Sequence, residues 1–96
     1  MAEIDRSTVW PYDERGQPRD FLYQRYGHPT GAEAEAALGG LEGGEALLYA
    51  SGTSAVTACA FALLQPGATV AVAEGAYFGT TVTLRELEPW GLKVTQ

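Results

Sequence analysis

The sequence predicts an α/β fold with a parallel sheet. Three short apolar runs bounded by turn residues have the length and composition of buried strands: residues 47–50, 69–73 and 92–95. Segments with helical features separate these runs, at residues 54–65 and 80–88. Strands that alternate with helices are typical of a parallel sheet whose faces are covered by helices.

The N-terminal segment precedes this alternating pattern. Residues 1–22 show neither helical nor strand periodicity, and Pro11 and Pro18 interrupt them. We therefore expect residues 1–29 to form an extended arm, ordered, if at all, by packing on something else. Residues 30–96 are expected to form the first βα units of a larger domain, because the chain ends on a strand with nothing after it to bury that strand.

A first helix is expected directly after Pro29. Thr30 and Glu33 have the spacing of a capping box, with Thr30 as the N-cap and Glu33 reaching back to it. The apolar residues that follow lie on one helical face: Ala34, Ala37, Leu38 and Leu41. Gly43 and Gly44 are expected to end this helix.

The segment from Ser54 to Gln65 is apolar on nearly every side, so we expect a helix packed on both faces. Cys59, in its middle, is expected to be an inert core residue. Pro66 and Gly67 end this helix, and a loop at residues 74–79 leads into the next one.

Charge and length exclude several classes of function. Six basic and twelve acidic residues among 96 give a net charge of −6, which argues against nucleic acid or an anionic membrane as a partner. No apolar run approaches the ~20 residues of a membrane span. The single cysteine, Cys59, has no neighbour at metal-ligand spacing, so no metal site is expected. The N-terminus lacks a signal-peptide pattern, and a cytoplasmic protein is expected.

Ser51 to Ser54, S-G-T-S, lie between an apolar run and a predicted helix. A strand that leads through a glycine-containing turn into a helix is suited to holding a phosphate. The first N–H groups of a helix have no internal partner, and the helix dipole places partial positive charge there. The same four residues could also form a plain turn.

Three blocks of sequence together resemble a known family. They read YQRYGHPT at 23–30, LEGGEALLYASGTSAV at 41–56 and AYFGTT at 76–81. Their order and spacing resemble the N-terminal part of the Cys/Met-metabolism family of pyridoxal-phosphate (PLP) enzymes. This family includes the cystathionine synthases and lyases, methionine gamma-lyase and the homoserine-ester sulfhydrylases. The resemblance implies the large domain of PLP fold type I.

The resemblance implies roles for two residues toward a neighbouring subunit. Tyr23 and Arg25 match the tyrosine and arginine that hold the phosphate of the neighbour's cofactor. A guanidinium group grips phosphate oxygens in bidentate fashion, and a phenol adds a neutral donor. The parent enzyme is therefore expected to be at least a homodimer.

Further roles concern the cofactor of the same subunit. Gly52 and Thr53 match positions whose backbone amides bind its phosphate, and Ser51 belongs to the same turn. Tyr77 matches the tyrosine that stacks on the pyridine ring and assists proton movement, so it is the one candidate catalytic residue.

The sequence departs from the family pattern at three positions. Gln24 replaces the usual serine, His28 the usual asparagine, and Thr53 the usual methionine. A histidine before a proline is more often structural than functional. Structural alternatives exist for two of these residues. Arg25 could be a surface arginine paired with a carboxylate, and Tyr77 could be an ordinary loop aromatic.

One requirement of the family's chemistry is not met by this chain. PLP catalysis needs a lysine amine that binds the cofactor covalently and moves protons. The only lysine is Lys93, in a predicted strand, whereas the family's lysine lies far later in the sequence. The resemblance therefore implies an N-terminal portion of an enzyme for elimination or replacement at the β- or γ-carbon of sulfur-containing or homoserine-derived amino acids. The alternatives are a non-catalytic module that binds a phosphorylated ligand and a subunit-interaction module.

Overall fold

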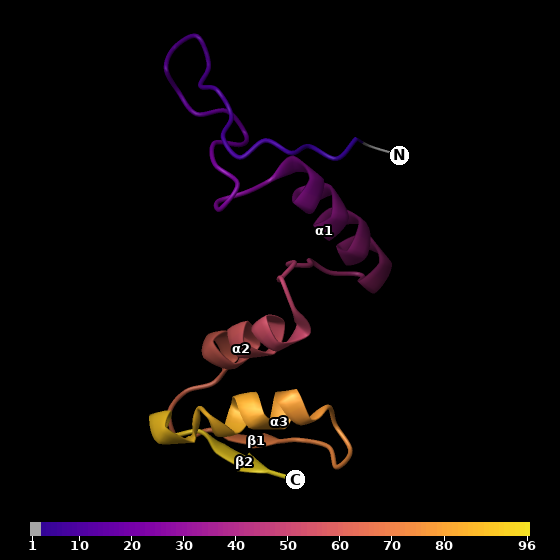
Figure 1. Ribbon diagram of the computed structural model, residues 1–96, viewed down its shortest axis with the longest axis vertical. Helices are drawn as coiled ribbons and strands as arrows, with labels where there is room; N and C mark the ends of the chain where they lie inside the picture. Colours follow the sequence, from indigo (N-terminus) through magenta and orange to yellow (C-terminus); the bar gives the residue numbers. More distant parts are fainter. Residues whose placement is uncertain (1–2) are drawn as a thin grey trace. The chain divides into compact units, whose positions relative to one another are not determined.

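The structure is a computed structural model that describes residues 3–96. The chain forms two compact units, one ending at Leu48 and the other beginning at Tyr49. The domain boundary predicted at residues 29 and 30 stays a prediction. The elements follow in the order α1 (Pro29–Glu42), α2 (Gly52–Leu63), β1 (Thr69–Ala71), α3 (Phe78–Arg85), a 3-10 helix η1 (Glu88–Trp90) and β2 (Lys93–Thr95) (Figure 1).

The arm of the first unit folds back on itself. An antiparallel bridge joins Val9 to Tyr23, and the Gln24 N–H donates to the Thr8 carbonyl at 2.8 Å. The bend between these segments is closed by Asp13, whose carboxylate accepts two backbone N–H groups at 2.8 Å. The arm is therefore a closed loop rather than a free extended strand.

Side chains of the same unit hold this loop against the start of α1. The Trp10 ring lies 5.9 Å from Phe21 and meets the edge of His28 at 5.3 Å. The Asp5 N–H donates to Thr30 Oγ1 at 2.9 Å. The arm is therefore ordered by contacts within itself and with the start of α1.

Helix α1 begins two residues before the start predicted with Thr30 as the N-cap. His28 is its N-cap, with an extended backbone, and its Nδ1 accepts the Thr30 N–H at 3.1 Å. The prediction of a capping box between Thr30 and Glu33 is thus wrong, because the helix already begins at Pro29. The fixed φ of proline suits the first helical position, and the N–H group that proline lacks would have no partner within the helix there. The end of the helix is confirmed, since Gly43 adopts a left-handed conformation with φ of 72°.

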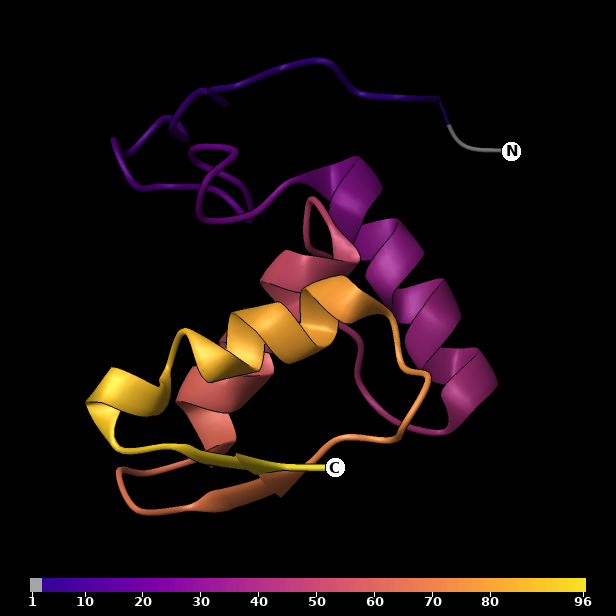
Figure 2. The ribbon, with the colours of Figure 1, turned by 60° about the horizontal axis from the view of Figure 1, so that its bottom comes forward.

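In the second unit, β1 and β2 pair in parallel, with Val70 opposite Val94. This confirms the predicted parallel pairing, although both strands are shorter than the runs 69–73 and 92–95. Helix α3 connects the two strands and packs against both α2 and β2. Both helices lie on the same side of the strand pair in Figures 1 and 2.

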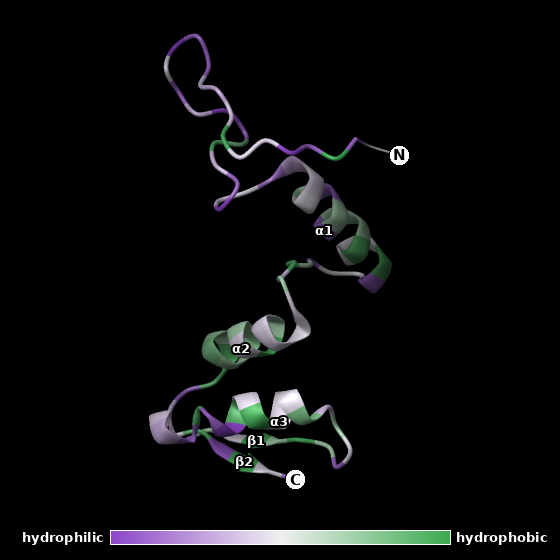
Figure 3. Ribbon diagram, in the orientation of Figure 1, coloured by the Kyte–Doolittle hydropathy of each residue, from purple (hydrophilic) through white to green (hydrophobic). Residues whose placement is uncertain are grey.

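The core of this unit contains one residue from each helix and one beside each strand. Its buried members are Ala60, Val72, Leu84 and Leu92, each at most 8% exposed. The residues of α2 are mostly apolar (Figure 3), yet Phe61 and Leu63 are 64% and 79% exposed. The prediction that α2 is packed on both faces is therefore wrong, because α3 and the sheet cover only one face of this helix. Cys59 is exposed as well, so the expected core position is also wrong.

Residues 47–50 do not form the predicted strand. They have irregular backbone, and Leu47 is 73% exposed. A strand is defined by hydrogen bonds to a neighbour, and no described segment pairs with these residues. Their apolar character alone does not supply such a partner.

Replacing Leu84, which lies in the core of the second unit, should destabilise the chain strongly. We expect Leu84→Ala to lower the free energy of unfolding by about 2–5 kcal/mol, because it removes buried methyl groups and leaves a cavity. Leu63→Ala is the matched control, since Leu63 is 79% exposed on α2. Urea titrations followed by circular dichroism measure both variants; equal losses would contradict the assigned core.

The arm contains a carboxylate whose ionised form is stabilised. The Ser7 N–H donates to Asp5 Oδ1 at 2.7 Å, and the Trp10 indole N–H to Oδ2 at 3.3 Å. Hydrogen bonds from the Ser7 backbone and hydroxyl lower the pKa of Asp5 most, with smaller contributions from Trp10 and the charge of His28. The contribution of Asp5 to stability is therefore complete above the ordinary carboxylate pKa of about 4 and is lost as the pH falls through its lower folded pKa.

Acid should consequently loosen the arm below about pH 4. Trp10 fluorescence in a Trp90→Phe background reports this change, because Trp10 then is the sole tryptophan. Asp5→Asn should remove the part of the acid transition that belongs to this carboxylate. Asp20→Asn, which removes an exposed carboxylate of the same arm, should leave the transition in place. An unchanged transition in Asp5→Asn would refute the assignment.

Candidate cofactor-binding site

The amino end of α2 is closed by two serines. Ser51 is the N-cap, and its Oγ accepts the Ser54 N–H at 3.0 Å. In return, Ser54 Oγ accepts the Ser51 N–H at 3.1 Å. This reciprocal capping box fixes the turn S-G-T-S at the point where the sequence predicted a phosphate site.

Two adjacent amides remain free at this helix end. The Ser54 N–H is capped, and the Ala55 N–H donates to the Ser51 carbonyl at 3.1 Å. The N–H groups of Gly52 and Thr53 have no hydrogen-bond acceptor among the described residues. Gly52 has open space where a side chain would stand. Two exposed donors at the positive end of a helix are suited to an anion.

The topology places this turn at the carboxyl edge of the sheet. Helix α2 leads through a short link into β1, so it runs back along the strand and begins near the end at which β1 finishes. Helix α3 follows β1 and also begins at that edge, which is at the right of Figure 1. Ligands of open α/β folds bind outside the carboxyl ends of parallel strands.

Tyr77 lies at the start of α3, at this same edge. It is the N-cap position, makes no side-chain capping bond and is 64% exposed. Its ring contacts Phe78, with centroids 4.8 Å apart, and lies over Gly79. A Cβ atom at residue 79 would stand 2.5 Å from Tyr77 Cε1. The ring can take this position only because residue 79 has no side chain.

The first unit brings together Tyr23 and Arg25. The Arg25 Cζ atom lies 5.1 Å from the centroid of the Tyr23 ring and 5.3 Å from that of Tyr26. Arg25 forms no ion pair with any described carboxylate; the ion pair among residues 3–96 joins Arg85 to Glu88 of the second unit at 3.5 Å. The alternative of a carboxylate-paired Arg25 is therefore wrong. Sequence reasoning missed Tyr26, although aromatic residues flank the arginine in Y-Q-R-Y.

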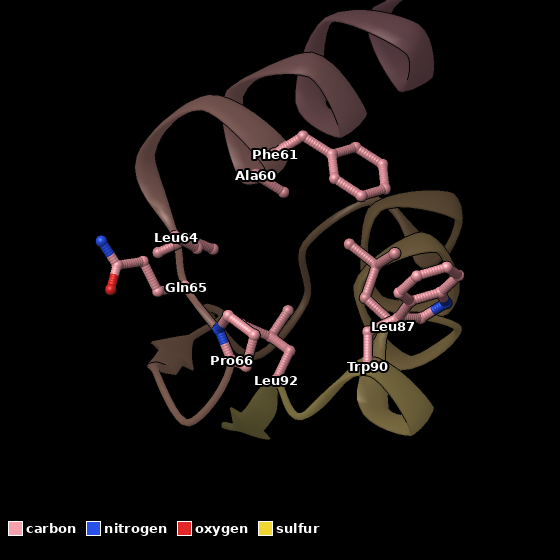
Figure 4. A pocket seen from close by; sticks show the side chains of 8 residues that line it. All are labelled: Ala60, Phe61, Leu64, Gln65, Pro66, Leu87, Trp90 and Leu92. Carbon is pink, nitrogen blue, oxygen red and sulfur yellow. The ribbon is translucent and has the colours of Figure 1, made fainter.

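The second unit also contains a cavity of about 210 Å³ at the other end of α2 (Figure 4). It is lined by Ala60, Phe61, Leu64, Gln65, Pro66, Leu87, Trp90 and Leu92. Gln65 is the one polar side chain among them and points away from the aromatic rings (Figure 4). A phosphorylated ligand needs donors or charge, so this cavity is no candidate for it.

Comparison with known proteins shows the family of this chain. The whole chain, residues 1–96, matches the family described as Cys/Met metabolism PLP-dependent enzyme. The chain belongs to this family. The resemblance seen in the three sequence blocks is thus confirmed.

Individual proteins and a solved structure are also similar to this chain. Rat cystathionine gamma-lyase is 33% identical over 97 residues, covering 99% of this chain and 24% of that enzyme. A Streptomyces coelicolor relative is 32% identical over 79 residues, covering 77% of this chain and 20% of its own length. A crystal structure of a cystathionine gamma-lyase from Micromonospora echinospora superposes with a TM-score of 0.82 and 31% identity, over 97% of this chain and 24% of that one.

These matches confirm the α/β fold class predicted for a fold type I PLP enzyme. The chain spans about a fifth to a quarter of the length of these relatives. None of the helices among residues 3–96 combines the length and apolar character needed to cross a membrane.

The groups of this chain fit one part of pyridoxal phosphate. The free amides of Gly52 and Thr53 suit a phosphate, and an exposed ring at Tyr77 suits a flat pyridine. The lysine amine that would attach the cofactor covalently is not found beside these groups. Lys93 pairs with Thr69 at the amino end of the strands. Its neighbour Leu92 lines the cavity at the far end of α2, a helix about 18 Å long.

A side chain at residue 79 should displace the Tyr77 ring. We expect Gly79→Ala to move the ring-proton signals of Tyr77 in NMR spectra. It should leave the stability of α3 equal or up to about 1 kcal/mol higher, because alanine favours helix over glycine. Gly31→Ala in the first turn of α1 is the control, since its added Cβ would meet nothing closer than 3.9 Å. Unmoved Tyr77 signals in Gly79→Ala would contradict the contact.

Proposed function

We propose that this chain supplies the phosphate and ring contacts of a PLP site in an enzyme of sulfur amino-acid metabolism. The reaction is elimination or replacement at the β- or γ-carbon of a cysteine, cystathionine, methionine or homoserine-ester substrate. The observation that carries the proposal is the pair of free amides at Gly52 and Thr53 in a chain of the Cys/Met-metabolism family.

The residues at the amino end of α2 bind the phosphate in this proposal. The Gly52 and Thr53 amides donate to phosphate oxygens, and the dipole of α2 adds favourable potential. Ser51 contributes by holding the turn, since its Oγ is engaged with Ser54 at 3.0 Å. An amide N–H remains a donor throughout the range near neutral pH, so the pH dependence of this contact comes from the phosphate, whose second ionisation lies near pH ~6.

Tyr77 acts on the ring side of the site. When bound, PLP serves as an electron sink that stabilises negative charge on the substrate carbon. The phenol ring of Tyr77 stacks on the pyridine, and its hydroxyl moves a proton near the reacting carbon. Its exposure and its freedom from capping bonds leave both the ring and the hydroxyl available.

Tyr23 and Arg25 serve the cofactor of a neighbouring subunit in this proposal, which makes the enzyme at least a homodimer. The guanidinium group of Arg25 is free of carboxylates within the described chain and can offer its N–H groups to a phosphate. The amine that attaches to the cofactor comes from a part of the enzyme other than this chain, because Lys93 lies at the opposite edge of the sheet.

Titration with PLP tests the proposal. We expect the purified chain to bind PLP more tightly than pyridoxal, which lacks the phosphate, and inorganic phosphate to compete. Reduction with borohydride followed by mass spectrometry should show no specific adduct at Lys93. A specific adduct there would overturn the assignment of the amine. Equal affinity for PLP and a plain phosphate monoester would favour the non-catalytic phosphate-binding module instead.

A pair of variants at Gly52 isolates one amide. Gly52→Pro removes the N–H at the first helical position, where proline is tolerated, and the extended Ser51 before it is compatible with proline. Gly52→Ala keeps the N–H and adds a Cβ into the same open space. We expect the proline variant to bind PLP about tenfold or more weakly than the alanine variant, the effect of one hydrogen bond to a charged group. Equal dissociation constants would refute the role of this amide.

A further inference from the structure

Tyr26 is a residue to which neither the sequence motifs nor the proposed function gives a role. The residue is 76% exposed. The Arg25 Cζ atom lies over this ring at 5.3 Å and over the Tyr23 ring at 5.1 Å. The two rings stand 6.1 Å apart and nearly perpendicular, at 77°. The Arg25 Cζ atom and the two ring centroids thus form a triangle, and Arg25 contacts both rings at once.

The backbone brings the two rings to the same guanidinium group. The Tyr26 N–H donates to the Tyr23 carbonyl at 2.9 Å, and the Gly27 N–H donates to the same oxygen at 3.2 Å. This turn reverses the chain within four residues. Tyr23 itself is fixed by its bridge to Val9. The position of the Tyr26 ring thus follows from hydrogen-bonded backbone and not from chance contact.

The surrounding charge makes this arrangement informative. The chain carries twelve acidic and six basic residues, so an exposed arginine has many carboxylates available. Arg25 nevertheless pairs with none of those in residues 3–96. Contact with the two rings stabilises the cation. Its N–H groups, which lie at the edge, remain available for an anion.

We propose that Tyr26 is a positioning residue, which together with Tyr23 holds Arg25 away from carboxylates and presents its N–H edge to a phosphate. The proposal rests on the proposed function, in which Arg25 binds the cofactor phosphate. Tyr26 itself does not touch the ligand. Its contribution requires an aromatic face and does not require the phenol hydroxyl.

Three variants test this role by two separate measurements. Tyr26→Leu removes the aromatic face, Tyr26→Phe keeps it, and Tyr12→Leu replaces another exposed tyrosine of the same unit as control. The first measurement is the NMR shift of the Arg25 side-chain protons, which ring currents displace without any ligand. The second is the dissociation constant for PLP of the dimeric chain, because the proposed function assigns Arg25 to the cofactor of the neighbouring subunit.

We expect Tyr26→Leu to lose part of the ring-current shift and to bind PLP roughly two- to fivefold more weakly, as for one exposed cation–π contact. Tyr26→Phe and Tyr12→Leu should match the unaltered chain in both measurements. A leucine variant that keeps the Arg25 shift, or that loses it and binds PLP unchanged, overturns the positioning role.

Arg25→Ala separates this outcome from failure of the proposed function. The phosphate role of Arg25 is refuted if Arg25→Ala binds PLP as the unaltered chain does, or if the unaltered chain binds no PLP. In either case the positioning role of Tyr26 is refuted as well. If Arg25→Ala weakens binding and Tyr26→Leu does not, only the inference about Tyr26 falls.

Discussion

Parallel pairing of β1 with β2 is the constraint on which the second unit depends. Two parallel strands cannot be joined by a tight turn, so α3 must cross from the end of β1 to the start of β2. The crossing buries Leu84 against the strands and against Ala60 of α2. It also places the start of α3, with Tyr77, at the carboxyl edge, where α2 begins too. The candidate site is therefore a consequence of strand direction.

The chain combines an acidic character with groups suited to an anion. A net charge of −6 offers no broad basic surface. The candidate phosphate contacts instead use backbone N–H groups, which carry no net charge, and one arginine that contacts two tyrosine rings. Both devices are local, so they are compatible with an acidic surface elsewhere.

Histidine at position 28 illustrates how local hydrogen bonds decide a boundary. The spacing of Thr30 and Glu33 satisfies the capping-box pattern, but Pro29 already fixes the start of the helix. His28 then becomes the N-cap, and Thr30 Oγ1 is free to accept the Asp5 N–H at 2.9 Å. The departure from the family's usual asparagine therefore keeps a capping acceptor before the proline, which is a structural role.

The sequence by itself predicted the family from three blocks in order, and it predicted the three helices and the strand character of residues 69–71 and 93–95, because periodicity, turn residues and helix ends are local properties. Tertiary structure decided the rest. Residues 47–50 have the composition of a strand but no partner, and Cys59 lies on a face of an apolar helix that nothing in its unit covers. A backbone turn brings Tyr26 into contact with Arg25. The start of α3 places the ring of Tyr77 over Gly79. Pairing, burial and ring contacts depend on which segments meet in space, which local pattern does not encode.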